Sequence, residues 1–478
     1  MKRTLEIIEI VLICLVSLSM AIHAELNKRA QDALPGTLPE MSNPSYWFEK
    51  MKHPDEVILN TEAIMKMNED YIRKISAPDP FKGVPSERIP QDKYLNRFPG
   101  HFLVKPDIST MKPDEISILV REKIREDRDF LRKEKYGNSF SVEYADREID
   151  AFEKEMALDL FDDEIVSRDG IAVCTTRLRI VPSFFPEQVG LNNIQKNIYS
   201  TDLWTSSLVK IGRHVTILHN SRSGSYVFVL SDNGFGWVES QDIAFGNVKE
   251  IKEYSNPENF IVCTGDRVPF YSDKRCMYVS GWLRMGDRAP LAAKEDTRII
   301  SVPVRAVNGK FRTETAWLAE DADISVGWLP YTRRNVVVTA FKLLDNPYDW
   351  TESSFGRNHE TTYRDIFACF GFELPYHGSL FTFFGDYEEA TMPDIGREKQ
   401  YEMVLRHEPF VTIMTAHSHG HSMLLLGEYG GKPIAFDQNG YGYTAEDGTW
   451  YEIKRTCLVD MSIPAYFLKS PITFLELK

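Results

Sequence analysis

One stretch in the last third of the chain, residues 346–374, constrains its fold more than any other part. Asn358 and Thr361 are candidate N-terminal caps of a helix there, and Gly371 is a candidate C-terminal cap. Between the caps, apolar residues recur three and four positions apart, at Tyr363, Ile366, Phe367 and Phe370. This spacing predicts a helix with one apolar face.

A second stretch, residues 420–438, supplies the element that this helix can face. It reads as two strands joined by a turn at Gly430-Gly431, which predicts a β-hairpin. His421 opens the first strand, and Asp437 lies near the end of the second. A helix N-terminus facing a strand with a histidine and then an acidic residue is typical of papain-like thiol hydrolases. In those enzymes the helix dipole and the histidine together hold a cysteine as thiolate.

Three motifs in these stretches resemble those of the NlpC family of cell-wall cysteine peptidases, in the branch with an N-terminal stabilising domain and two bacterial SH3-like domains. Tyr348 and Trp350 match the family's Tyr-Gly-Trp-Gly-Gly loop. Residues 363–367, Tyr-Arg-Asp-Ile-Phe, match its Leu-Arg-Asp-Leu-Phe helix. Residues 420–424, Gly-His-Ser-Met-Leu, match its Gly-His-Ile-Met-Leu strand. The similarity runs from about residue 40 to the C-terminus.

The resemblance implies roles for five residues. It places His421 at the position of the general base and Asp437 at the position of the residue that orients the base. Tyr348 and Trp350 fall in the loop that contacts substrate. The position of the nucleophile, a cysteine in the family, holds His359 when it is counted back along the helix motif.

No other residue is expected to replace the missing thiol. Cys369 lies ten residues further along the predicted helix. It is therefore about 15 Å from His359 and near the negative end of the helix dipole, which opposes a thiolate. Ser353 and Ser354 lie in the preceding loop, where nothing holds them against His421. The imidazole of His359 itself is expected to be neutral, because the positive end of a helix dipole disfavours imidazolium.

The length of 478 residues predicts three or four domains. Charged helical patterns give way to short strands and then to the motifs above, so the predicted fold class is multi-domain α+β. The expected parts are a signal peptide (1–24), a helical N-terminal stabilising domain (25–165), two SH3-like β-barrels (166–247 and 258–335) and a C-terminal papain-like NlpC domain (336–478).

The beginning of the chain predicts export. Lys2-Arg3 precede a short apolar run within residues 1–24, as in secretory signals, and an uncleaved membrane anchor is the alternative. We therefore expect a secreted or periplasmic protein of the cell envelope. A formal net charge of −14 disfavours nucleic acid and anionic lipid as main partners.

Each predicted barrel ends in a Gly-Trp pair. In such domains exposed aromatic residues often bind glycan or peptide. From sequence alone, Trp237 and Trp328 are interpreted as core residues of the barrels, with a binding role as the alternative.

No metal or cofactor is expected. His417, His419 and His421 alternate, which is a metal-like spacing, but the first two are interpreted as a solvated strand entry. His359, His421 and Asp437 form a second candidate set that suits zinc or iron, kept only as an alternative because a diverged site needs no ligand. The cysteines form no C-x-x-C pair and are interpreted as buried free thiols, with a disulfide between Cys263 and Cys276 as the alternative.

Three functions are compatible with these features. The favoured one is a catalytically impaired pseudoenzyme that binds peptidoglycan stem peptides, because loss of a nucleophile removes most of the rate while His421, Asp437 and Tyr348 are kept. One alternative is an active endopeptidase that cuts D-γ-glutamyl-diamino acid bonds. The other is a non-catalytic envelope protein that interacts through its SH3-like domains. A membrane contact is expected only through an uncleaved signal segment.

Overall fold

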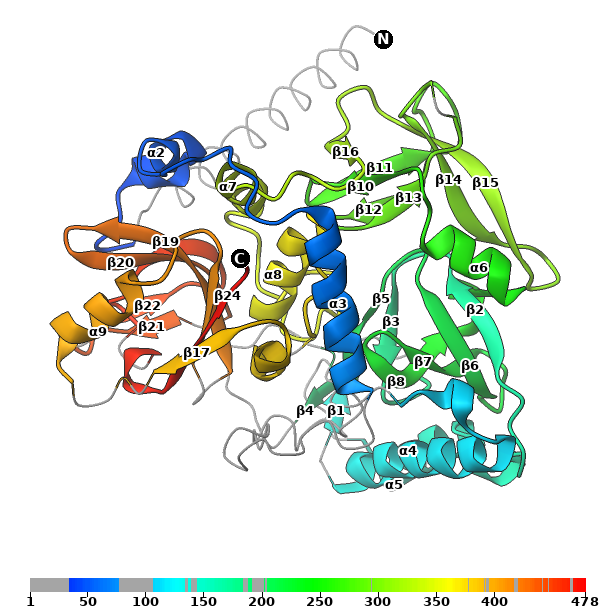
Figure 1. The fold of residues 1–478 in the computed structure, drawn as a ribbon. Helices are drawn as coiled ribbons and strands as arrows, with labels where there is room; N and C mark the ends of the chain where they lie inside the picture. The colour runs from blue at the N-terminus through cyan, green and yellow to red at the C-terminus, as the bar shows by residue number, and fades with distance from the viewer. Residues whose placement is uncertain are drawn as a thin grey trace, which may run out of the picture.

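The structure is a computed structural model in which the C-terminal part of the chain packs against two β-barrels (Figure 1). The predicted signal segment, residues 1–24, lies outside the residues that the structure describes. The described residues are 34–76, 106–133, 136–138, 144–183, 188–190, 202, 204–293, 295–376, 378–390, 392, 395–416, 420–440, 442–445, 447–464 and 467–478.

A six-stranded antiparallel sheet organises the C-terminal part, in the strand order β17-β24-β18-β19-β20-β23. The predicted hairpin is confirmed as β19 and β20. Tyr429 pairs with Lys432 across Gly430 and Gly431, whose positive φ angles suit a tight two-residue hairpin turn. The strands are β17 (Tyr387–Ala390), β18 (Thr412–Ala416), β19 (His421–Tyr429), β20 (Lys432–Asn439), β23 (Arg455–Asp460) and β24 (Ile472–Glu476), with a small ribbon of β21 (Gly442–Thr444) and β22 (Trp450–Glu452) beside them.

Helices α7 (Arg333–Phe341) and α8 (His359–Ala368) cover one face of this sheet. The predicted caps of α8 are confirmed, since Asn358 accepts from Thr361 N at 2.8 Å and Gly371 closes the C-terminus. The Tyr363 hydroxyl lies 2.9 Å from Phe436 O and 3.2 Å from Ser422 O, so it pins α8 to β20 and β19. The opposite face of the sheet carries α9 (Arg397–Leu405). Of the short helices in this part, η7 (Gly378–Phe383) lies near α3 (Thr61–Ile75), and η8 (Phe467–Lys469) precedes β24.

The first barrel is a seven-stranded sheet in the order β5-β3-β8-β7-β6-β2-β9. Strands β6 and β7 form a hairpin around Ser223-Gly224. Trp237 is fully buried against Phe228, so it is a core residue and not a binding residue. The strands are β2 (Arg168–Ala172), β3 (Thr176–Arg179), β5 (Thr205–Val209), β6 (His214–Asn220), β7 (Tyr226–Ser231), β8 (Gly234–Glu239) and β9 (Ile243–Phe245). The short helix η6 (Ser240–Asp242) lies between β8 and β9, and α6 (Val248–Ser255) follows β9.

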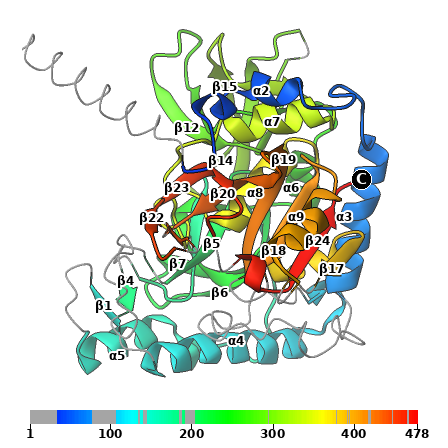
Figure 2. The ribbon, with the colours of Figure 1, turned by 90° about the vertical axis from the view of Figure 1, so that its left-hand side faces the viewer.

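The N-terminal helices divide into two groups. Helices α4 (Pro113–Lys133) and α5 (Asp146–Glu155) share a core with the first barrel around Trp204 and Trp237, and both views show them beneath it (Figure 2). Helix α5 does not continue into η4 (Leu158–Leu160), because Ala157 adopts a positive φ between them. Helices α2 (Pro44–Phe48) and α3 (Thr61–Ile75) instead pack on the C-terminal part, around Trp47 and Tyr71. The remaining short elements are η1 (Pro39–Ser42), η3 (Ile108–Thr110) and the pair β1 (Tyr136–Asn138) with β4 (Gln188–Gly190).

The second barrel consists of two sheets, in the orders β13-β10-β16 and β12-β11-β15-β14. Trp328, which was predicted to be a core residue, is only half-buried and packs against Phe260 and the Arg288 guanidinium at the edge of the barrel core. The exposed tryptophan of this barrel is Trp282, with 54% of its surface accessible. The strands are β10 (Phe260–Cys263), β11 (Arg267–Tyr271), β12 (Val279–Arg284), β13 (Arg288–Pro290), β14 (Ile299–Arg305), β15 (Phe311–Leu318) and β16 (Ile324–Val326).

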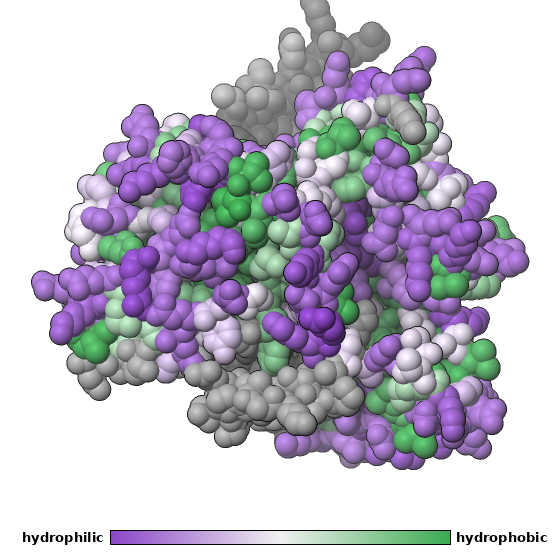
Figure 3. Space-filling view, in the orientation of Figure 1, coloured by the Kyte–Doolittle hydropathy of each residue, from purple (hydrophilic) through white to green (hydrophobic). Residues whose placement is uncertain are grey.

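The face of the molecule in Figure 3 is mostly hydrophilic, in keeping with the net charge of −14. Among the described residues, no helix is both long and apolar enough to span a bilayer. The cysteines at positions 263 and 276 do not form the alternative disulfide, since both are free thiols.

Candidate active site

The start of α8 is held in place by its own cap and by the loop before it. Asn358 N donates to Thr361 Oγ1 at 3.0 Å, while the Asn358 side-chain amide donates to Trp350 O at 3.0 Å. The Gln438 amide on β20 donates to Arg357 O at 3.2 Å. These bonds tie the loop, the helix cap and the sheet together, so the first residue of α8, His359, has a defined position.

His359 lies against the sheet at the point where β19 begins. Its ring centroid is 4.7 Å from that of His421, and its Nε2 is 3.2 Å from Gly420 O. On the other side, Nδ1 lies 3.5 Å from the Tyr348 hydroxyl, and the two rings are nearly parallel. The imidazole therefore sits between a tyrosine and a second histidine, with 14% of its side chain exposed.

The acidic neighbour of His359 corrects the expectation of a neutral imidazole. Burial alone would lower the pKa of His359, but the Glu360 carboxylate, 3.0 Å from Nε2, raises it above the ordinary histidine value, with smaller contributions from Asp437 and Gly420 O. The expectation weighed the helix dipole and neglected the next residue in the chain. A buried carboxylate at hydrogen-bonding distance outweighs the partial charge of a helix terminus.

His421, Asp437 and a third residue form a buried chain of polar contacts. His421 Nε2 lies 2.7 Å from Asp437 Oδ1, and the Tyr443 hydroxyl contacts Asp437 Oδ2. Phe467 meets the His421 ring edge-on. With Asp437 fully buried and His421 only 9% exposed at its side chain, this carboxylate orients the imidazole as in an acid–base dyad.

Tyr348 is fixed by close packing on the residues just after β20 and just before β23. Its backbone N donates to Lys454 O at 3.1 Å, and its ring lies so close to Gly440 that a Cβ there would be 2.4 Å from the ring. Only glycine fits under this ring. Trp350 is half-buried and contributes its carbonyl to the Asn358 cap, so the structure brings both predicted loop residues to the site.

Both barrels contact the loop between Tyr348 and α8. From the first barrel, Arg177 Nε donates to Ser353 O at 2.7 Å, and Ser353 Oγ accepts from Asp202 N at 3.2 Å. From the second barrel, Arg284 lies 2.8 Å from the buried Glu352 carboxylate. The loop is thus clamped from two sides.

The comparisons with known proteins agree with this architecture. A family model described as "SH3 domain (SH3b1 type)" matches residues 195–239. A solved structure described as a novel NlpC/P60 endopeptidase from Photobacterium damselae subsp. piscicida superposes with a TM-score of 0.66 at 17% identity, covering 90% of this chain and 96% of that one. The chain has the NlpC/P60 fold.

The predicted resemblance is therefore confirmed at the level of the fold. A second NlpC/P60 family structure, from Bacillus cereus ATCC 10987, aligns over 64% of this chain and 98% of that chain at 15% identity. Its TM-score of 0.41 is too low to support a comparison of the folds. A search of curated proteins finds no match.

Among the described residues of this NlpC/P60 fold, neither Cys369 nor Cys457 is placed as a nucleophile for His421. Cys369 lies at the far end of α8, where its thiol contacts Cys263 O and Asp365 O, and burial raises its pKa to about 12. Cys457 pairs with Asp437 across β20 and β23, but burial and the Asp437 charge raise its pKa well above the ordinary value. Neither thiol is set up to be a thiolate.

The metal alternatives find no support in the described residues, where no group of three histidine, cysteine, aspartate or glutamate side chains is arranged to hold an ion. Two members of the alternating set, His417 and His419, lie outside the residues that the structure describes. His359, His421 and Asp437 do come together, and their contacts to Glu360, Gly420 and Tyr443 are hydrogen bonds within the protein.

Sequence reasoning missed two residues of the site. Glu360 directly follows His359, and its effect on the imidazole required only that adjacency to be weighed. Tyr443 lies on β21, and no motif of the sequence links it to Asp437. The contact depends on how the chain turns after β20.

Proposed function

We propose that this chain is a peptidoglycan-directed protein of the NlpC/P60 type that binds cell-wall stem peptides without cysteine-type cleavage. The observation that carries the proposal is the position of His359, the first residue of α8. Its ring centroid lies 4.7 Å from that of His421, and His421 keeps its contact with the Asp437 carboxylate. In a thiol hydrolase that helix position carries the attacking sulfur. We further propose a location in the cell envelope, with residues 1–24 as the export signal.

His359 is a poor substitute for a thiolate. With its pKa raised by Glu360, the imidazole carries a proton over a wider pH range than an ordinary histidine. A protonated imidazole has no lone pair for attack on a carbonyl. The same charge suits a binding role, because an imidazolium beside the Tyr348 hydroxyl attracts a ligand carboxylate.

The alternative of an active endopeptidase is favoured by one observation, the intact His421–Asp437 pair. Such a pair can activate a nucleophile other than a protein thiol. The interaction-protein alternative is favoured by the exposed Trp282 on the second barrel.

A hydrolysis assay separates these functions. The unmodified full chain is incubated with stem-peptide fragments, and released L-Ala-D-Glu is measured by mass spectrometry alongside peptide affinity by calorimetry. Binding without release is the expected result. Release that disappears in His421→Ala would contradict the proposal and favour the endopeptidase, whereas neither binding nor release favours the interaction protein.

A further inference from the structure

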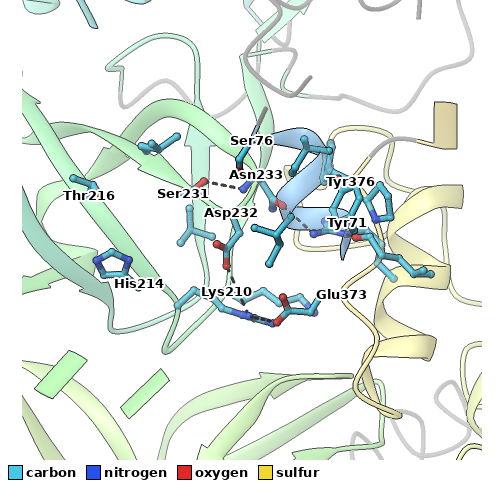
Figure 4. Close-up of a pocket in the computed structure, with 18 of the residues that line it drawn as sticks. Tyr71, Ser76, Lys210, His214, Thr216, Ser231, Asp232, Asn233, Glu373 and Tyr376 are labelled. Atoms are coloured by element: carbon cyan, nitrogen blue, oxygen red, sulfur yellow. Dashed lines mark hydrogen bonds and ion pairs between the residues drawn. The ribbon is translucent and has the colours of Figure 1, made fainter. Parts of the chain in front are cut away.

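A cavity of about 600 Å³ lies toward the opposite end of α8 from His359 (Figure 4). Its walls come from the last turn of α3, from the first barrel, and from α8 with the residues that follow it. Ligand sites in proteins commonly have volumes of about 300–1,000 Å³. The α8 residues at the cavity are Arg364, Asp365 and Ala368, so it is separated from His359 by roughly 8–14 Å along the helix.

One part of the cavity wall is held together by short ionic and hydrogen-bond contacts. Lys210 Nζ lies 2.6 Å from the buried Asp365 carboxylate. Arg364 donates to Leu374 O at 3.0 Å and to Asn233 Oδ1 at 2.9 Å, and its guanidinium covers the Tyr376 ring. These short contacts join the first barrel to α8 and to the residues that follow it.

A second part of the wall holds a partly exposed ion pair, Arg213 with Glu373, close to Asp232. Arg213 Nη1 lies 3.3 Å from Glu373 and 3.8 Å from Asp232, against about 2.8 Å for a good charge-assisted hydrogen bond. The side chains of Arg213, Glu373 and Asp232 are 30%, 44% and 51% exposed. Figure 4 shows Asp232 reaching from the first barrel and Glu373 from the opposite wall toward the same space. Exposed, long ion pairs contribute little, so a ligand can exchange with them at small cost.

We infer that this cavity is a second binding site, for a short zwitterionic peptide. A ligand carboxylate pairs with Arg213, a ligand ammonium pairs with Glu373, and apolar groups contact Ile72 and Leu374 on the wall. A stem peptide with a diamino acid carries both kinds of charge. The choice of a wall peptide rests on the proposed function, whereas the site itself rests on the cavity and its charges.

Calorimetry on the full chain with the tripeptide L-Ala-γ-D-Glu-meso-diaminopimelate tests the inference. The unmodified protein is expected to show two binding events. Arg213→Gln and Glu373→Gln should each weaken one event by about 10-fold, because each removes half of a charge-assisted contact. Arg121→Gln is the matched control, since Arg121 is also 30% exposed and paired with a carboxylate but lies on α4 away from the cavity. Tyr348→Ala should weaken only the other event.

The outcomes separate this site from the groove at His359. A single event that Tyr348→Ala removes and Arg213→Gln leaves unchanged would overturn the second site and leave the proposed function standing. An Arg213-sensitive event that persists in Tyr348→Ala supports it. Equal binding of L-Ala-L-Glu-L-Lys at that event would contradict the assignment of a wall peptide, and no binding by any variant would contradict both proposals.

Discussion

At the scale of single residues, the site is defined by the contacts of His359. Its Nε2 faces Gly420 O and Glu360, and its Nδ1 faces the Tyr348 hydroxyl. Such a ring is surrounded by acceptors and by one hydroxyl, which favours the protonated form. These contacts are the basis for the proposal that the residue at the start of α8 is a charged anchor and not an attacking group.

This charge state predicts a titration. The pKa of His359, followed by NMR, is expected to lie above the ordinary value of about 6.5. Glu360→Gln should lower it, because burial then acts without the opposing carboxylate. By linkage, the stability contributed by His359 is present below its unfolded-state pKa and is lost as the pH rises through the folded-state pKa. A titration midpoint below that of an ordinary histidine in the unmodified protein would refute this interpretation.

At the scale of elements, the loop before α8 is shaped by packing from both sides. The Tyr348 ring lies on Gly440, and the Asp349 carboxylate accepts from Ser354 N at 2.8 Å and from Gly356 N at 3.1 Å. The loop therefore presents Tyr348 to His359 through close contacts at Gly440 and Gly356, where a side chain would clash with Tyr348 and Asp349.

Gly440→Ala tests this packing. The new Cβ would meet the Tyr348 ring at 2.4 Å, so the ring must move, and affinity for the tripeptide is expected to fall by about 10-fold. The double variant Tyr348→Ala, Gly440→Ala should bind no more weakly than Tyr348→Ala alone, because the clash is gone. Additive losses in the double variant would show that Gly440 acts by another route.

Another element, β12, carries the exposed surface of the second barrel. Arg284 at its end reaches Glu352 beside the candidate site, and Trp282, two residues earlier, is 54% exposed. If the barrels bind the wall, Trp282→Ala should reduce co-sedimentation with insoluble peptidoglycan several-fold, since an exposed tryptophan contributes about 1 kcal/mol or more when a ligand covers it. Trp450→Ala is the control, because Trp450 is similarly exposed at 57% but lies on β22. Equal effects of both changes would remove the assigned role of Trp282.

At the scale of the whole molecule, one carboxylate joins three parts of the chain. Asp365 on α8 lies 2.5 Å from Arg284 of the second barrel, 2.6 Å from Lys210 of the first barrel and 2.7 Å from Arg357 of the loop. Burial alone would raise the pKa of Asp365, but Arg284, Lys210 and Arg357 lower it far below the ordinary value. Both barrels therefore dock on α8 through Asp365, and the loop before α8 contacts the same carboxylate through Arg357.

Asp365→Asn is expected to be strongly destabilising. It leaves Arg284 and Arg357 buried with less charge compensation, which costs roughly 3–5 kcal/mol. Thermal unfolding measures the loss, and Asp323→Asn is the control, because its pair with Lys342 is exposed and contributes roughly 1 kcal/mol or less. Since the pKa of Asp365 is depressed, its contribution is present above the ordinary carboxyl pKa and is lost as the pH falls through the folded-state pKa. Equal changes in both variants would contradict the assigned role of this network.

The sequence predicted the parts of this picture that depend on local patterns. The caps and apolar face of α8 and the Gly430-Gly431 hairpin follow from residue spacing, and the structure confirms them. The convergence of Asp365 with both barrels was not predictable in this way, because its partners lie 81 and 155 residues away. The contact of Tyr443 with Asp437 was missed for another reason: the two residues are only six positions apart, and the contact depends on how the chain turns after β20.

The most direct measurement of the central claim is hydrolysis by His359→Cys. The account predicts that this variant releases L-Ala-D-Glu from stem-peptide fragments, because a thiol at the first position of α8 would lie beside His421 and its bound Asp437. The unmodified protein should release none, and His359→Cys with His421→Ala should be inactive. Release by the unmodified protein, or no release by a folded His359→Cys, would contradict the account.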